Sequence, residues 1–222
     1  MAYPSPDHHP SSRLPQTPSG GTPTAPHPFV AIPLPLPRSP LDTDDQVRQW
    51  YENELGWATV PGPPVELLTG LRFDVLEVPT EAGHAALRHL GPGSPVAVRA
   101  DRMRLLVAAG SADELPGLLD WLEWGSLALD LRAIGAGGRI EAPLPRHTRS
   151  TRSSTVDGSQ GAAVWLRPPE PDCEVEPALP TLSALGGGGG GAPDLVRLVD
   201  TMATQCHRIR LRQARSQALA FS

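Results

Sequence analysis

Lysine is absent from this chain of 222 residues, and asparagine occurs only once. Every one of the 19 Lys-or-Arg positions is therefore an arginine. Together with the abundance of alanine, glycine, proline and leucine, this bias is typical of a GC-rich bacterial genome. Because the bias replaces every lysine, the use of arginine in place of lysine is by itself no sign of bidentate ligand recognition.

Cysteine is nearly absent as well, with only Cys173 and Cys206, which lie far apart. A disulfide framework is excluded on this count, and reduced thiols are expected. The first residues contain no apolar segment typical of a signal peptide, and no apolar run is long enough to span a bilayer. We therefore expect a soluble, cytoplasmic protein without a membrane partner.

Proline and glycine, in contrast, account for 49 residues and are unevenly distributed. Their clustering predicts a disordered Pro-rich tail over 1–40, since such a segment cannot bury enough apolar surface to offset its ordering entropy. A domain is expected over 41–170, with a mobile basic loop at 146–160. A Pro/Gly linker over 171–192 then leads to a C-terminal helix over 193–222.

The tail contains one apolar patch, Phe29–Ile32 followed by the proline-rich run Pro33–Pro37. Proline-rich segments are pre-extended and can bind partners at low entropic cost. A docking peptide and a plain linker are both open interpretations, and the linker is the simpler one.

Within 41–170, helical and strand patterns mix without strict alternation, which predicts an α+β domain with a mixed sheet and flanking helices. In the third helix, Ser111 and Glu114 form a capping-box pattern. The expected helices are Asp42–Leu55, Thr80–Leu90 and Ser111–Leu122; the expected strands are Trp57–Val60, Val65–Leu68, Phe73–Pro79, Pro95–Val98, Arg102–Val107, Leu127–Leu131, Gly138–Ala142 and Gly161–Leu166.

The strand Phe73–Pro79 is the centre of this pattern, because strand formers fill it and Pro79 closes it. It contains two carboxylates, Asp74 and Glu77, and a buried charge is costly unless it has a partner or a task. Either these acids form salt bridges, or the strand holds metal ions in a nucleotidyl-transfer fold. Residues two apart share a face, so Glu77 and Asp74 should point to opposite faces.

Other chemical motifs are weak. His8-His9 lie in the tail, the run Gly186–Gly191 lacks the Lys and Ser/Thr of a phosphate loop, and Cys206-His207 point about 100° apart on a helix. The final helix carries an apolar stripe that requires a covering surface, on this domain or on another chain. The stripe consists of Leu195, Val196, Val199, Met202, Ala203, Cys206 and Ile209.

Taken in order, six short motifs over roughly 42–168 resemble the N-terminal domain of bifunctional DNA primase/polymerases, in the archaeo-eukaryotic primase superfamily, and look closest to short divergent actinomycete versions. The motifs are Gly56-Trp57 with Val60-Pro61; Thr69-Gly70; Asp74–Pro79 followed by Gly83; Arg102–Val107; Leu129–Arg132 followed by Gly137-Gly138; and Ala142-Pro143 with Trp165-Leu166.

The resemblance implies divalent-metal nucleotidyl transfer, using acids that match Glu77 and Asp130. The family's second acid falls on Pro79, and its histidine position is matched by Arg102 or Arg104. One glutamate and Asp130 are weak candidates for a single metal ion, whereas two-metal catalysis needs converging carboxylates. We therefore expect no catalytic residues and no cofactor; an active protein would need Mg²⁺ or Mn²⁺.

Charge agrees with this expectation, because residues 42–145 contain sixteen acids and eight arginines. Such an acidic domain predicts weak nucleic-acid binding at most. The leading hypothesis is a catalytically degenerate primase/polymerase-like domain that binds a nucleotide, nucleic acid or protein. The alternatives are an active primase/polymerase with a rebuilt metal site, and a small adaptor that uses its Pro-rich tail and C-terminal helix to bind a protein partner.

Overall fold

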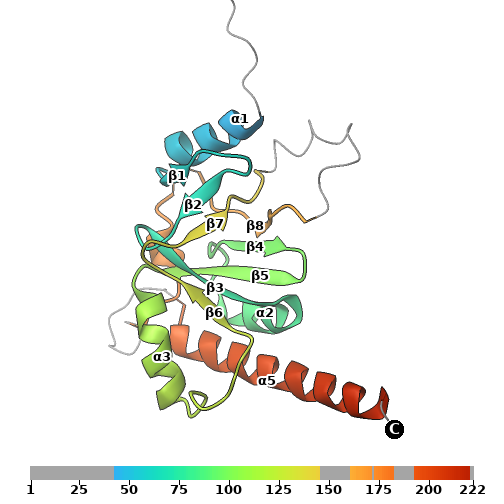
Figure 1. Ribbon diagram of the computed structural model, residues 1–222. Helices are drawn as coiled ribbons and strands as arrows, with labels where there is room; N and C mark the ends of the chain where they lie inside the picture. The colour runs from blue at the N-terminus through green and yellow to red at the C-terminus, as the bar shows by residue number, and fades with distance from the viewer. Residues whose placement is uncertain (1–42, 146–160, 172, 183–192, 221–222) are drawn as a thin grey trace, which may run out of the picture. The chain divides into compact units, whose positions relative to one another are not determined.

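The computed structural model describes residues 43–145, 161–171, 173–182 and 193–220 (Figure 1). The expected disordered tail over 1–40, the loop over 146–160 and the glycine run all lie outside these residues. The expectations for those three segments therefore stay predictions.

Two antiparallel sheets form the β-structure of the described residues. The larger has the order β6-β3-β5-β4-β8 and the smaller β1-β2-β7. The α+β class is confirmed, but every pair of adjacent strands is antiparallel, so the expected mixed sheet is wrong. The strands are β1 (Thr59–Val60), β2 (Glu66–Leu68), β3 (Phe73–Pro79), β4 (Val96–Arg99), β5 (Arg102–Ala108), β6 (Arg132–Ile134), β7 (Arg139–Glu141) and β8 (Val164–Arg167).

Helices α2 (Thr80–Ala86), α3 (Ser111–Trp121) and α5 (Leu195–Ala220) lie on one side of the larger sheet (Figure 1). Their apolar side chains pack on the strand residues that point to this side, including Leu76 and Leu105. The stripe of α5 is covered here, with Leu195, Val199, Met202 and Cys206 buried. The final helix therefore docks on the domain through this stripe.

The other face of the larger sheet packs on an aromatic cluster. The cluster is formed by side chains of the larger sheet together with those of α1 (Thr43–Gln49), the π-helical turn η1 (Trp50–Glu54) and the smaller sheet. Tyr51 is fully buried; its hydroxyl donates to the Pro143 carbonyl at 2.5 Å and accepts from the Trp165 indole at 2.9 Å. Burial raises the pKa of Tyr51 well above its ordinary value, and the Trp165 hydrogen bond acts in the opposite direction.

The sequence-based prediction is wrong for one strand, Leu127–Leu131. The strand after α3 is instead β6, which starts at Arg132 and pairs with β3. Leu129 and Leu131 alternate as strand residues do, but they pack against the helical side from an irregular segment. The glycine turn between β6 and β7 therefore connects the two sheets and does not form a hairpin.

The start of α3 also differs from the expected capping box. Gly110 occupies the N-cap position with φ of 91°, and Ser111 is the first helical residue. The N-cap residue forms no side-chain hydrogen bond with the helix. Instead, the carboxylate of Asp74 in β3 accepts a hydrogen bond from the Ala112 amide in the first turn.

Residues 173–182 belonged to the expected linker, yet they pack onto the domain. Here η3 (Glu176–Ala178) is flanked by Val175 and Leu179, which are both buried in the aromatic core. The Ala108 amide at the end of β5 donates to the Pro180 carbonyl at 3.0 Å.

A second 3₁₀ turn, η2 (Leu87–His89), follows α2. None of the helices in the described ranges is long and apolar enough to cross a membrane.

Candidate functional site: an arginine face on the larger sheet

Four arginines gather on one face of the larger sheet, toward one end of β3 and β5. Antiparallel pairing places Glu77 of β3 opposite Arg104 of β5, and Pro79 opposite Arg102. Arg102 in turn lies opposite Arg99 of β4, and Glu77 lies opposite Arg132 of β6. Directly opposed residues share a face, so we name Arg99, Arg102, Arg104 and Arg132 the arginine face.

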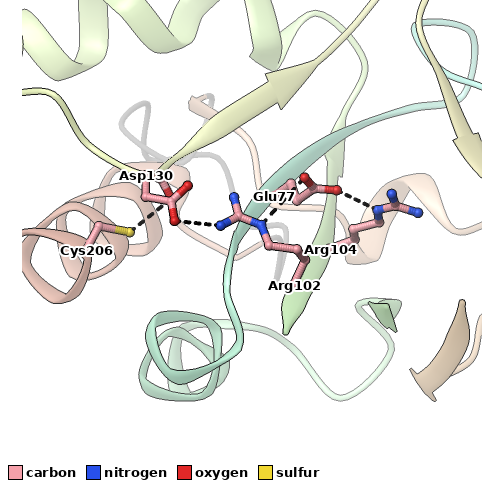
Figure 2. Close-up of polar contacts among 5 residues, drawn as sticks. All are labelled: Glu77, Arg102, Arg104, Asp130 and Cys206. Carbon is pink, nitrogen blue, oxygen red and sulfur yellow. Dashed lines mark hydrogen bonds and ion pairs between the residues drawn. The ribbon is translucent and has the colours of Figure 1, made fainter. Parts of the chain in front are cut away.

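Glu77 lies between two of these arginines (Figure 2). The Arg104 Nε donates to Glu77 Oε2 at 2.7 Å, and Arg102 Nε lies 3.6 Å from Glu77 Oε1. Arg102 also reaches away from the sheet, and its Nη1 donates to Asp130 Oδ2 at 2.7 Å. The contacts thus form a continuous line from Asp130 through Arg102 and Glu77 to Arg104.

The segment that carries Asp130 is attached to α5. The Cys206 thiol donates to the Asp130 carbonyl oxygen at 3.4 Å (Figure 2). Burial raises the pKa of Cys206 to about 11, and the nearby Asp130 charge adds to the rise. The thiol is therefore neutral at physiological pH and serves as a hydrogen-bond donor rather than a nucleophile.

Burial increases along this line of contacts. The side chain of Asp130 is 65% exposed, whereas Arg102 is 22% and Arg104 only 9% exposed. Arg104 Nη1 is buried and has no hydrogen-bond partner among the described residues. Burial by itself lowers the pKa of Arg102, but the Asp130 hydrogen bond and the Asp130 and Glu77 charges outweigh it, so the pKa is raised. The Arg102 guanidinium is therefore charged.

The carboxylates that match the family's metal ligands are both engaged with arginine. Glu77 and Asp130 each contact Arg102, so a guanidinium occupies the space that converging metal ligands would share. Within the described residues, no group of three or more His, Cys, Asp or Glu side chains could hold a metal ion. Pro79, at the second acid position, supplies neither a charge nor an amide hydrogen to this end of the strand.

Asp74 lies on the opposite face, as strand alternation predicts. It is fully buried on the helical side, and its Oδ2 accepts a hydrogen bond from the Ala112 amide at 2.9 Å. This carboxylate thereby satisfies an unpaired amide in the first turn of α3 and opposes the positive end of the helix dipole. Asp74 stabilises the packing of α3 on β3 and takes no part in the arginine face.

Two glycines of the primase-like motifs have structural explanations. A Cβ on Gly70, which has φ of 88°, would lie 2.2 Å from the Ala136 backbone. A Cβ on Gly83 in α2 would lie 2.4 Å from the Met103 sulfur. Both positions require glycine for close packing, so the match of these residues to the motifs carries no information about catalysis.

Sequence reasoning missed Arg99 and its surroundings. The Arg99 Nε donates to Glu141 Oε2 at 2.7 Å, and Glu141 Oε1 accepts from the Ala163 amide at 3.2 Å. This pair borders a pocket of about 420 Å³, lined in addition by Asp44, Pro64 and Leu144. The available signal was the spacing of Arg99 and Arg102 across a tight β4–β5 turn, which places them opposite each other.

Comparison with known proteins identifies no relative: no family model, no curated protein and no solved structure matches the chain.

Proposed function

We propose that this chain is a catalytically degenerate relative of the primase/polymerase domains and binds the phosphate groups of a nucleotide or nucleic acid at the arginine face. The observation that carries this proposal is the pairing of Glu77 with Arg102 and Arg104. A carboxylate held between two guanidinium groups is already neutralised by arginine, so we infer that it serves as an arginine partner and not as a metal ligand.

The same contacts leave cationic groups available to an anion. Arg104 contributes its charge from a buried position, where its Nη1 lacks a partner among the described residues. Arg132 is exposed and forms no ion pair with another described residue, and Arg102 is exchangeable because its partner Asp130 is largely exposed. Guanidinium groups match phosphate oxygens in a bidentate geometry and need no metal ion to do so.

Binding should be weak. Three carboxylates, Glu77, Asp130 and Glu141, offset the four arginines, and the surrounding domain is acidic. Since phosphate affinity depends on the net positive charge presented to the ligand, we expect dissociation constants of roughly 10⁻⁴ M or weaker, sensitive to salt. Template-dependent nucleotide incorporation is not expected, with either Mg²⁺ or Mn²⁺.

Titration calorimetry with a deoxynucleoside triphosphate tests this proposal. The wild type should give saturable binding, Arg102→Gln should weaken it about tenfold or more, and Arg139→Gln should leave it unchanged. Arg139 is a suitable control because it lies on the smaller sheet and pairs only loosely with Glu66, at 3.7 Å. Absence of saturable binding by the wild type would refute the proposal, as would equal affinities of the two variants.

An adaptor role is the second candidate. It is favoured by the C-terminal part of α5, which is exposed from Leu211 to Gln217 beyond the stripe that docks on the domain. The proline-rich tail, the other proposed recruiting segment, lies outside the described residues. The surface chemistry of α5 supports a more specific inference, which does not depend on phosphate binding.

A further inference from the structure

The C-terminal end of α3 presents an exposed aromatic side chain between two acids. Trp121 is 68% exposed, and Asp120 and Glu123 beside it are exposed as well. A tryptophan this exposed is unusual, because burying its large apolar surface is favourable. We name Asp120, Trp121 and Glu123 the acidic knob.

Local stability does not explain the charges of the acidic knob. Carboxylates near a helix C-terminus are disfavoured by the helix dipole, and neither acid forms an ion pair with another described residue. Glu123 also adopts a left-handed backbone conformation with φ of 66°, which costs free energy for a residue with a side chain. Both features point to a role in recognition rather than in folding.

A surface of opposite charge lies on the C-terminal part of α5. Arg208, Arg212 and Arg215 are spaced so that they share one helix face. They line a groove of about 370 Å³ together with Gln205, Leu211 and Glu81 of α2. We name this the basic groove.

The basic groove has unused binding capacity. Leu211 is 47% exposed beside the arginines. Arg212 pairs with Glu81, whereas Arg208 and Arg215 form no ion pair with another described residue. The groove thus combines an exposed apolar side chain with cations that lack partners in the described part of the chain.

We propose that the acidic knob of one copy of this chain docks into the basic groove of a second copy. The two surfaces are complementary in charge and in apolar character. The Trp121 indole can contact Leu211 and stack on a guanidinium group. Asp120 and Glu123 can then pair with Arg208 and Arg215. Arginine is the cation that most often packs on tryptophan faces. A second copy is favoured over a foreign acidic protein because each chain carries both halves of the contact.

The positions of the two surfaces allow a closed dimer. The segment after the acidic knob is fixed to the N-terminal part of α5, where the Trp124 indole donates to Asp200 Oδ1 at 3.0 Å. The basic groove begins at Gln205 of the same helix. Because the knob is held near the start of α5 and the groove lies farther along the same helix, two chains related by a two-fold axis can fill both contacts at once. The contact also covers the part of α5 from Leu211 to Gln217, whose side chains are exposed.

Sedimentation velocity of the full chain tests the proposal, combined with two charge-reversal variants. The knob variant is Asp120→Arg/Glu123→Arg, and the groove variant is Arg208→Glu/Arg215→Glu. We expect the wild type to form a dimer of twice 23.6 kDa that dissociates as salt is raised. Each variant alone should be monomeric, because its knob and groove then carry like charges.

An equimolar mixture of the two variants should recover the dimer, since the reversed knob of one matches the reversed groove of the other. This recovery also shows that both variants are folded. Trp121→Ala should weaken the dimer at least tenfold, whereas Leu71→Ala, which truncates another side chain that is 64% exposed, should have no effect. A wild type that stays monomeric up to about 200 μM refutes the proposal, as does a dimer unaffected by either charge reversal.

Discussion

Glu77 and Arg104 face each other across β3 and β5, and the Arg104 Nε donates to the Glu77 carboxylate at 2.7 Å in a nearly solvent-free position. A buried ion pair of this kind is costly to break from one side, because the remaining charge keeps its desolvation penalty without its partner. The pair therefore couples the centre of the fold to the proposed phosphate site.

Neutralising one partner of this pair should destabilise the domain. Glu77→Gln is expected to lower the free energy of unfolding by about 2–4 kcal/mol, because it leaves Arg104 buried without a counter-ion. The double variant Glu77→Leu/Arg104→Met should recover most of that loss. Urea unfolding at pH 7 measures both changes. Equal destabilisation of the single and double variants would show that the two side chains are not coupled.

Two glycines on helices should respond in opposite ways to substitution by alanine. Gly83→Ala places a methyl group 2.4 Å from the Met103 sulfur and should destabilise the domain by about 1–3 kcal/mol. Gly117→Ala in α3 meets nothing within 4 Å and should stabilise it by about 0.5–1 kcal/mol, because alanine favours the helix. Thermal unfolding of both variants tests the packing of α2 on β5. A neutral Gly83→Ala variant would contradict it.

The two cysteines should differ strongly in reactivity. Cys173 is exposed, whereas Cys206 is buried and its pKa is raised to about 11. At pH 8 a thiol-disulfide reagent should therefore modify one thiol per native chain quickly and the second only after denaturation. The Cys173→Ser variant should show almost no fast reaction. Rapid modification of that variant would mean that α5 does not cover Cys206 in solution.

Stability should decrease on acidification through the titration of His89. Burial lowers the pKa of His89 from 6.5, and the neighbouring Arg88 and Arg197 lower it further. The Arg88 Nε donates to His89 Nε2 at 3.0 Å, which requires the neutral ring. The unfolded chain then binds the proton more tightly, so the contribution of His89 is present above pH 6.5 and is lost as pH falls toward its folded pKa. His89→Gln should flatten this part of the pH profile of urea unfolding; an unchanged slope would contradict the assignment.

The sequence predicts the strands where local signals agree with the final packing. Phe73–Pro79 combines strand formers with a closing proline, and the structure places β3 at these residues. The same alternation at Leu127–Leu131 is misleading, because Leu129 and Leu131 pack against the helical side. The Asp130 carbonyl bonds to Cys206 and not to a neighbouring strand. No local pattern distinguishes these two outcomes.

The site was predictable only in part. Alternation correctly separated Asp74 from Glu77, since it depends on the strand alone. The pairing of Glu77 with Arg102 and Arg104 depends on the register between β3 and β5, which a single sequence does not specify. The role of Asp74 at the start of α3 likewise depends on a contact between residues 38 positions apart.

The most direct test of the central claim, that arginine has replaced metal at Glu77, compares deoxynucleoside triphosphate affinity in Mg²⁺ and in EDTA. A site built from guanidinium groups should bind the metal-free nucleotide equally well or better, because Mg²⁺ neutralises part of the charge that the arginines recognise. A metal-bridged site would require the ion instead. We predict that calorimetry gives an affinity in EDTA at least equal to that in Mg²⁺. Binding that appears only with Mg²⁺ or Mn²⁺, and disappears in both Glu77→Ala and Asp130→Ala, would contradict the claim and indicate an active polymerase site.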